Sequence, residues 1–272
     1  MPFRDDPCGI FCIMIVYAAV CYADYVIIAW IILPSMSLSF WGMFHATAFN
    51  FVIFLLTYSH FRAVMSDPGI VPLPTRNLDF SDVSNGQFPK RLLDKDGGHW
   101  TVCQRCEAYR PPRAHHCRVC RRCVRKMDHH CPWINNCVGE FNQKYFIQFL
   151  FYVGVASIYA ITLIILGWMG DCRICHDLHQ KNARIAHTIV LIVLALLFGL
   201  FVCAIGCDQM SAIFDDETAV EQVQHKGGIK EKTEKTTMQL LREVFGKGPI
   251  YCWLLPCRTT RYPLLTPPGY DV

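Results

Sequence analysis

Charged residues are scarce in this chain. Asp, Glu, Lys and Arg together make up 18% of its 272 residues, whereas 53% are hydrophobic. Soluble globular domains carry about 25% charged residues, so the composition argues against an ordinary soluble protein. The scarcity is also local, because residues 188–205 contain no charge at all.

Four apolar stretches account for the excess of hydrophobic residues: 9–33, 41–59, 145–168 and 187–207. Each is close to the roughly 20 residues that a helix needs to cross a bilayer. A soluble core helix of this length would carry a polar stripe. We therefore predict an all-α integral membrane protein with four transmembrane helices.

Basic residues are few in the two short loops. Residues 34–40 contain no Lys or Arg and residues 169–186 contain three, against 14 in residues 60–144 and eight in residues 208–272. Because basic loops stay in the cytosol, both termini and the long middle loop are expected there. We expect no cleavable signal peptide, since the first apolar stretch is too long for one and lacks a clear cleavage site.

These features divide the chain into five predicted parts. They are the first two helices in 1–65, a linker rich in proline and glycine in 66–100, a cysteine-rich domain in 101–144, the last two helices in 145–207 and a cytosolic tail in 208–272. The cytosol is reducing, which makes disulfides unexpected in the middle loop and metal binding or catalysis expected.

Residues 103–137 contain seven cysteines and four histidines. The pattern C-x2-C-x9-H-x6-C occurs twice among them, the second copy 14 residues after the first. Each copy supplies the four ligands of a closed, structural zinc site. One Zn²⁺ would take Cys103, Cys106, His116 and Cys123, and the other Cys117, Cys120, His130 and Cys137. Other pairings of these cysteines would break the repeat.

Subtracting these eight ligands leaves His115, His129 and Cys131. Cys131 begins a third copy of the pattern, but residue 134 is isoleucine where the next cysteine would stand. A cysteine without metal beside an imidazole can act as a nucleophile, with His129 as base and Asp128 orienting the imidazole. The alternative is an inert buried thiol beside an Asp-His pair that supports a zinc ligand. Spacing alone leaves both open.

The run from Cys103 to Phe146 reads C-x2-C-x9-HC-x2-C-x2-C-x4-DHHC-x5-C-x4-N-x3-F. It resembles, without a gap, the cysteine-rich domain of DHHC-type protein S-acyltransferases. The four-helix layout and Asp67-Pro68-Gly69 are similar to that family too. The resemblance implies that Cys131 accepts a fatty acyl group from acyl-CoA, such as palmitoyl-CoA, and passes it to a substrate cysteine. It also implies that His129 and Asp128 activate Cys131 and that two Zn²⁺ ions are structural.

The same resemblance suggests which residues meet acyl-CoA. Arg110 and Arg113 are candidates for the CoA phosphates, although anionic lipid would also attract basic residues here. Trp133 is expected beside the thioester, or else as an ordinary residue of the membrane interface. Ala156 would help to cap an acyl cavity between the four helices, and its small side chain predicts that 16-carbon and somewhat longer chains are accepted.

The tail departs from the family's pattern at two positions. Ala219 stands where the family has the second threonine of Thr-Thr-x-Glu, and Leu240 stands where it has asparagine ahead of Phe245-Gly246. Both departures concern the docking of the tail rather than the chemistry.

Expected partners are membrane lipid and substrate proteins with cysteines in or near the membrane. Tyr270-Asp271-Val272 could also add as a strand to a PDZ domain. A nucleic-acid partner is not expected, because the zinc region is tethered to a membrane and lacks a recognition-helix pattern. The family suggests the Golgi, with the endoplasmic reticulum and plasma membrane as alternatives. The competing function is a membrane-anchored zinc-binding adaptor in which Cys131 is inert.

Overall fold

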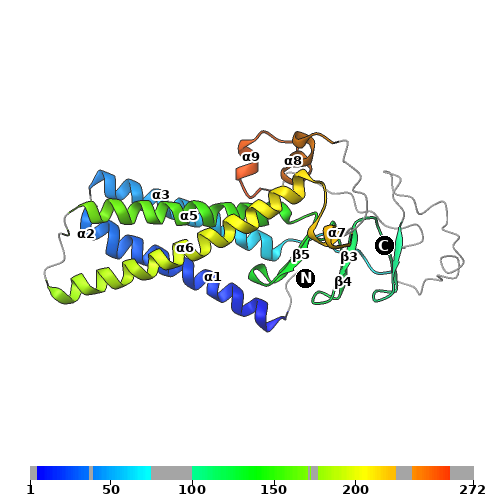
Figure 1. Cartoon of the computed structure of the whole chain (residues 1–272), viewed down its shortest axis with the longest axis horizontal. Helices are drawn as coiled ribbons and strands as arrows, with labels where there is room; N and C mark the ends of the chain where they lie inside the picture. The colour runs from blue at the N-terminus through cyan, green and yellow to red at the C-terminus, as the bar shows by residue number, and fades with distance from the viewer. Residues whose placement is uncertain are drawn as a thin grey trace, which may run out of the picture.

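The computed structural model describes residues 5–36, 39–74, 100–170, 172, 177–224 and 235–257. Most of the linker predicted in residues 66–100 lies outside them, and so does Tyr270-Asp271-Val272. Figure 1 shows two parts, a long helical bundle and a smaller region of short strands at one end of it.

Four helices in the described residues are long and apolar enough to cross a membrane. They are Pro7–Met36, which joins α1 (Pro7–Val26), the π-helical η1 (Ile27–Ile32) and α2 (Leu33–Met36), then α3 (Phe40–Met65), α5 (Gln143–Met169) and α6 (Leu178–Phe214). The predicted four-helix membrane protein is thus confirmed. All four helices extend beyond the predicted apolar stretches, and α6 extends furthest. It begins well before residue 187, because the Asp177 side chain accepts a hydrogen bond from the backbone N–H of Gln180 and caps the helix there.

The outer face of the bundle is apolar. Phe51, Ile158 and Leu200 are 58%, 70% and 70% exposed, an arrangement that lipid tolerates and water does not. Inside, Ile27 of η1 and Leu163 of α5 are completely buried in a cluster that joins all four helices. The bundle therefore has one packed interior and a surface suited to the hydrocarbon core.

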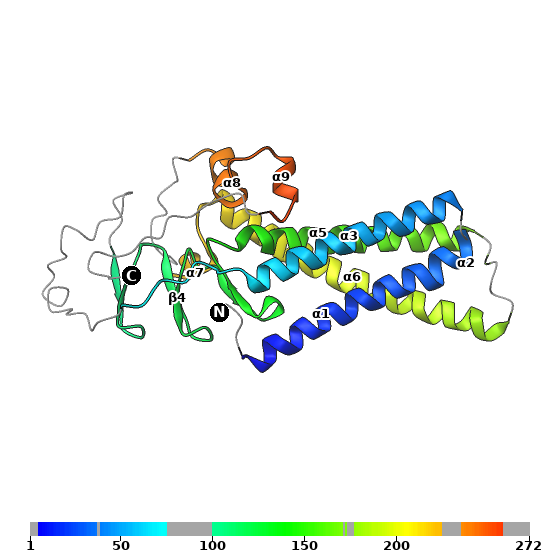
Figure 2. The same ribbon diagram turned by 180° about the vertical axis from the view of Figure 1, so that it is seen from behind.

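The cysteine-rich domain between α3 and α5 consists of hairpins. Three antiparallel pairs follow one another: β1 (Thr101–Cys103) with β2 (Ala108–Arg110), β3 (Ala114–Cys117) with β4 (Arg122–Arg125), and β5 (His129–Cys131) with β6 (Asn136–Val138). The predicted fold class is confirmed, because the membrane part and the described tail are helical and the hairpins make up the small cysteine-rich domain between α3 and α5. Two-stranded hairpins this short are not stable alone, so metal binding is the expected source of their stability. Figure 2 shows them beyond the end of the bundle.

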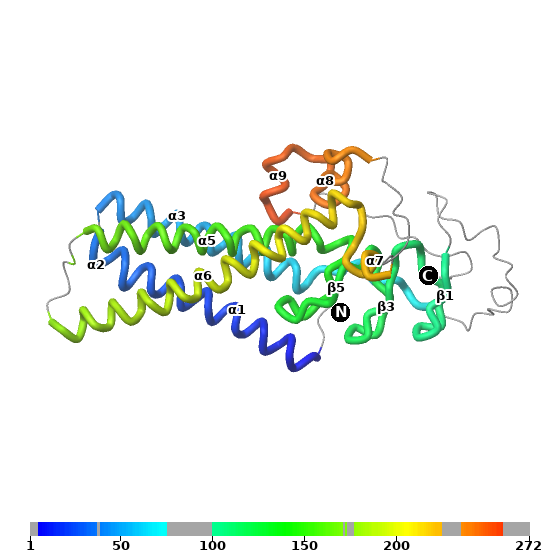
Figure 3. The backbone as a smooth tube through the Cα atoms, in the orientation of Figure 1, coloured from blue at the N-terminus to red at the C-terminus, as the bar shows by residue number. Residues whose placement is uncertain are grey.

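The described residues of the tail form three short helices, α7 (Ala219–Gln224), α8 (Thr237–Phe245) and α9 (Tyr251–Leu254). Figure 3 shows α8 and α9 beside the ends of α5 and α6 that face the hairpins. The carbonyls of residues 252–257 all accept hydrogen bonds from side chains of α3 and α5, namely Arg62, Lys144, Gln148 and Tyr152. These bonds dock the tail against the membrane helices.

Candidate active site and metal centres

Two groups of four side chains could each hold a metal ion, with their ligand atoms within 4.8 Å of one another. They are Cys103, Cys106, His116 and Cys123, and Cys117, Cys120, His130 and Cys137. Cys106 Sγ lies 3.1 Å from His116 Nδ1, and Cys120 Sγ lies 3.4 Å from Cys137 Sγ. Tetrahedral ligands at about 2.3 Å from zinc stand about 3.8 Å apart. The two groups fit zinc, and they are the sets that the repeat predicts.

The hairpins explain how a 14-residue repeat builds both groups. In the β3–β4 hairpin, His116 lies opposite Cys123 and both belong to the first group. The turn of the same hairpin carries Cys117 and Cys120, which belong to the second. Each group therefore takes two ligands from the turn region of one hairpin and two from the strands of the next, and the β3–β4 hairpin supplies ligands to both groups.

The turn of the third hairpin breaks this pattern. It contains Cys131 and the 3-10 helix η3 (Pro132–Ile134), followed by Asn135 in the left-handed conformation with φ of 47°. Cys131 belongs to neither metal group. It is 5% exposed and lines a cavity in the helical bundle. The thiol that the repeat leaves over is therefore placed at the junction of the two parts.

His129 connects Asp128 with Cys131. Its Nδ1 lies 2.6 Å from Asp128 Oδ2, and the Cys131 thiol is close enough to the same ring to raise its pKa. Because Nδ1 faces the carboxylate, Nε2 is the nitrogen available to the thiol. Burial lowers the pKa of His129, but the bonds to Asp128 and Cys131 outweigh this and raise it to about 9. Such an imidazole can hold a proton taken from the thiol.

Asp128 is 2% exposed and receives three hydrogen bonds. Besides His129, the donors are Gln209 Nε2 of α6, 2.8 Å from Oδ2, and the backbone N–H of Ala219 in α7, 2.8 Å from Oδ1. Burial raises the pKa of Asp128, but these donors keep it below the usual range. The carboxylate therefore stays charged through contacts with the membrane domain and the tail.

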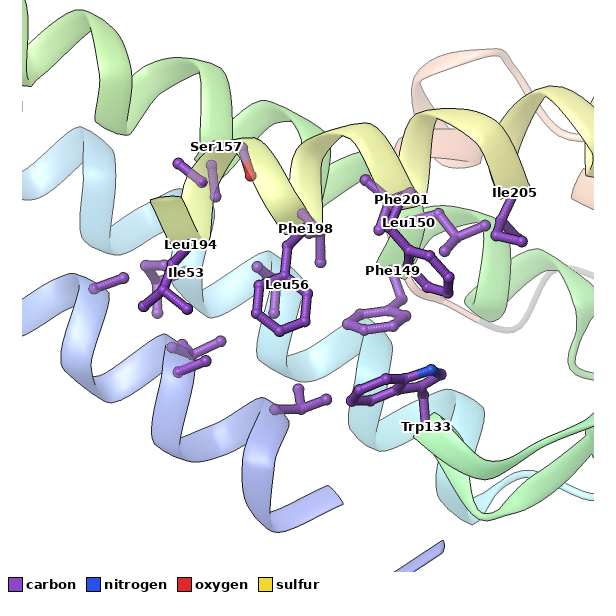
Figure 4. A pocket seen from close by; sticks show the side chains of 18 of the residues that line it. Ile53, Leu56, Trp133, Phe149, Leu150, Ser157, Leu194, Phe198, Phe201 and Ile205 are labelled. Carbon is purple, nitrogen blue, oxygen red and sulfur yellow. The ribbon is translucent and has the colours of Figure 1, made fainter. Parts of the chain in front are cut away.

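A cavity of about 320 Å³ extends from Cys131 into the bundle, between the four long helices. Its wall is almost entirely apolar and includes Val16 and Val20 of α1, Phe49 and Leu56 of α3, Phe149 and Ala156 of α5, and Phe198 and Val202 of α6. Figure 4 shows Trp133 at the hairpin end and Leu194 further along the bundle. The shape and lining suit an aliphatic chain with its reactive end at the thiol.

Trp133 and Ala156 both line this cavity, as the resemblance implies. The Trp133 ring lies 6.3 Å from the rings of Phe198 and Phe201. Ala156 and its neighbour Ser157 are each 9% exposed on the wall formed by α5. Their small side chains leave the middle of the cavity open.

The third hairpin is fixed to the first two membrane helices. Asn136 Nδ2 donates to three carbonyls at the end of α3, those of Ala63, Val64 and Ser66, at 3.2, 3.2 and 3.0 Å. On the other side, Gly9 of α1 lies so close to Asn135 that a Cβ at residue 9 would overlap its side chain. The turn that carries Cys131 is thus held between α1 and α3.

Arg113 binds the tail through its guanidinium. Its guanidinium donates twice to Glu221, at 2.7 and 2.9 Å, and twice to Asp216, at 2.8 Å to the carboxylate and 2.8 Å to the carbonyl. Four of its five N–H groups are therefore engaged. These contacts hold the tail, and the contact of Arg113 with CoA phosphates stays a prediction. Arg110 is half-buried and donates one bond to Thr101 Oγ1.

The two departures in the tail leave its docking intact. Residue 219 contacts Asp128 through its backbone N–H, which alanine supplies as well as threonine does. Leu240 is 4% exposed and packs against Ile147 and Ile213 of the membrane helices. At residue 240 the docking contact is therefore apolar.

Among the polar residues around the site that were not predicted are His60, Asn136 and Gln209. His60 and Gln209 are polar residues at or beyond the hairpin-facing ends of apolar stretches, and such residues usually have partners. Their polarity beside an apolar stretch could have indicated that they have hydrogen-bond partners. It could not have identified those partners, because Gln209 and Asp128 are 81 residues apart in the sequence.

Comparison with known proteins agrees with this geometry. Residues 97–226 match the family model of DHHC palmitoyltransferases. The chain is 35% identical to palmitoyltransferase ZDHHC3-A of Danio rerio, over 94% of this chain and 78% of that protein. It is 34% identical to palmitoyltransferase ZDHHC3 of Homo sapiens, over 95% and 84%, and 30% identical to probable protein S-acyltransferase 12 of Arabidopsis thaliana, over 91% and 87%. The chain therefore belongs to the DHHC palmitoyltransferase family.

Proposed function

We propose that this chain is a protein S-acyltransferase that carries a fatty acyl group from acyl-CoA to protein cysteines through a thioester on Cys131. One observation carries the proposal. The thiol beside the His129–Asp128 pair lies at the end of an apolar cavity in a membrane protein. Family membership supports the same activity.

In the first half-reaction, His129 Nε2 takes the proton of the Cys131 thiol. The sulfur attacks the carbonyl carbon of the acyl-CoA thioester, and the bond between that carbon and the CoA sulfur breaks. The CoA thiolate then takes the proton back from His129. Asp128 keeps Nε2 directed at the sulfur and balances the charge of the imidazolium.

In the second half-reaction, a substrate cysteine attacks the Cys131 thioester and gives its proton to His129. The bond to the Cys131 sulfur breaks, and that sulfur is reprotonated by His129. The chemistry needs no metal at the thiol. Two Zn²⁺ ions held by the two groups of ligands would stabilise the hairpins, since four protein ligands leave no open position.

The acyl chain, of which palmitoyl is the proposed example, would lie along the cavity wall at Trp133 and Ala156. Its CoA portion would extend toward the basic hairpin region, where Arg110 and Arg113 are the arginine candidates. Apolar burial of the chain favours binding by about 0.8 kcal/mol per methylene. Substrates would be cysteine-containing proteins at the membrane surface, because Cys131 lies where the hairpins meet the bundle.

The hairpins are proposed to face the cytosol. Cys172, in the connection between α5 and α6 at the opposite end of the bundle, is disulfide-bonded. Disulfides persist on the oxidising side of a membrane, whereas thiolate metal ligands need the reducing side.

We also propose the Golgi as the compartment, with the endoplasmic reticulum and plasma membrane as alternatives, and a PDZ partner at Tyr270-Asp271-Val272. Fractionation of cells and a pull-down with the terminal peptide would test these two assignments.

The test of the activity is acyl transfer from labelled palmitoyl-CoA onto the purified protein. We expect the label to appear on wild type, to be released by neutral hydroxylamine and to be absent from Cys131→Ser. Cys12→Ser is the matched control, because Cys12 is another free thiol on the neighbouring helix α1, and it should label normally. Undiminished labelling of Cys131→Ser, or none of folded wild type, would instead favour the zinc-binding adaptor.

A further inference from the structure

His60 of α3 is completely buried beside the turn that carries Cys131. Its Nε2 lies 3.0 Å from the carbonyl oxygen of Trp133, and its Nδ1 lies 3.2 Å from the hydroxyl of Tyr17 in α1. A carbonyl only accepts, so the bond to Trp133 requires a proton on Nε2. Nδ1 is then the acceptor of the Tyr17 O–H. A neutral imidazole satisfies both bonds at once.

The position of this chain of bonds is what matters for chemistry. Trp133 follows Cys131 by two residues, and Figure 4 shows its indole at the hairpin end of the cavity. Further along the chain the turn is bound to α3 through Asn136. His60 therefore holds the turn near the reacting thiol, and Asn136 holds it after the turn has ended.

Burying a polar ring without hydrogen-bond partners is unfavourable by about 2 kcal/mol or more. His60 avoids this cost because both of its ring nitrogens are hydrogen-bonded. The His60 ring also packs against Phe149, 4.8 Å between centroids, and Phe149 lines the cavity. The polar atoms of His60 thus contact the catalytic turn while its face contacts the wall around the acyl chain.

We propose that Tyr17 and His60 are positioning residues for acyl transfer. By fixing the Trp133 carbonyl, they set the direction in which the Cys131 sulfur and the indole face the cavity. The proposal rests on the proposed function of Cys131. It adds that the first transmembrane helix takes part in catalysis through a hydrogen-bonded chain and not only as a wall of the cavity.

The test compares His60→Gln with His60→Met in the full-length protein reconstituted in lipid. Glutamine and methionine have similar size and shape, but only glutamine can donate to the Trp133 carbonyl. Acyl-enzyme formation would be measured in single turnover against palmitoyl-CoA concentration. We expect His60→Met to lower the maximal rate about tenfold with little change in the half-saturating concentration, and His60→Gln to recover most of it.

A second readout is independent of acyl transfer. The rate at which iodoacetamide alkylates Cys131, measured by mass spectrometry, should change in His60→Met and return toward wild type in His60→Gln. Equal behaviour of the two variants in both assays would overturn the positioning role. If wild type forms no acyl-enzyme but the alkylation contrast persists, the proposed function fails while the positioning stands.

Zinc content and thermal unfolding would show whether His60→Met is folded. If it is not, Tyr17→Phe decides, because it removes one hydroxyl and leaves the ring that packs 5.2 Å from His60. We expect this variant to keep its zinc and to lose about threefold in maximal rate. A wild-type rate in Tyr17→Phe would remove Tyr17 from the chain and overturn the proposal.

Discussion

Gln209 of α6 donates a hydrogen bond to Asp128 of the cysteine-rich domain over 2.8 Å, and both side chains are almost fully buried. The bond joins α6 to the carboxylate that is hydrogen-bonded to His129. It makes the geometry of the candidate active site depend on how the cysteine-rich domain sits on the membrane bundle.

Replacing Gln209 with leucine should therefore slow acyl-enzyme formation. A hydrogen bond to a buried charge contributes about 1.5–3 kcal/mol, so we expect a loss of about 10- to 100-fold in rate. The neighbouring Asp208 is exposed, and Asp208→Asn is the matched control that should leave the rate unchanged. A wild-type rate in Gln209→Leu would mean that the other two donors suffice for Asp128.

Replacing Arg113 and replacing Arg110 should affect different kinetic parameters of acylation. Arg113→Gln breaks the ion pairs with Glu221 and Asp216 and should loosen α7, so that Asp128 loses the N–H of Ala219. We expect the maximal rate of acylation to fall about tenfold, and a double-mutant cycle with Glu221→Gln to give a coupling of about 1–3 kcal/mol. Arg110→Gln should mainly raise the half-saturating concentration of palmitoyl-CoA. The same effect on both parameters in both variants would contradict this division.

The zinc content of cysteine variants should distinguish the metal ligands from Cys131. We expect two Zn²⁺ per chain in wild type and in Cys131→Ser, because Cys131 lies in neither group. Cys120→Ser should retain no more than one, since it removes a ligand of the second group. Elemental analysis of the purified variants measures this directly. Loss of zinc from Cys131→Ser would place that thiol among the ligands and remove the candidate nucleophile.

Acyl-chain preference should depend on Ala156. Competition among acyl-CoAs of different length should show that wild type accepts 16 carbons and somewhat longer chains. Ala156→Phe should shift the preference toward about 14 carbons, since each buried methylene contributes about 0.8 kcal/mol. Ile158→Phe enlarges a residue of the same helix that is 70% exposed on the outer face, and it should change nothing. A sharp preference of wild type for 14 carbons would refute the prediction.

The membrane helices and the metal groups were accessible from the sequence because their signals are local. An apolar run long enough to span a bilayer is visible without any knowledge of its neighbours. The repeat of 14 residues likewise predicts the ligand sets, because each set comes from two hairpins that follow one another in the sequence. Helix ends were less accessible, as the early start of α6 at the Asp177 cap shows.

The sequence by itself determined which thiol the metal groups leave over and which imidazole stands beside it. Only the tertiary structure decided what surrounds that pair: Gln209 and Ala219 on Asp128, Glu221 on Arg113, and His60 on the Trp133 carbonyl. Each of these contacts joins residues at least 73 positions apart. Such contacts result from the packing of whole helices against the hairpins. That packing depends on many weak interactions between distant residues, so the spacing of neighbouring residues in the sequence does not predict it.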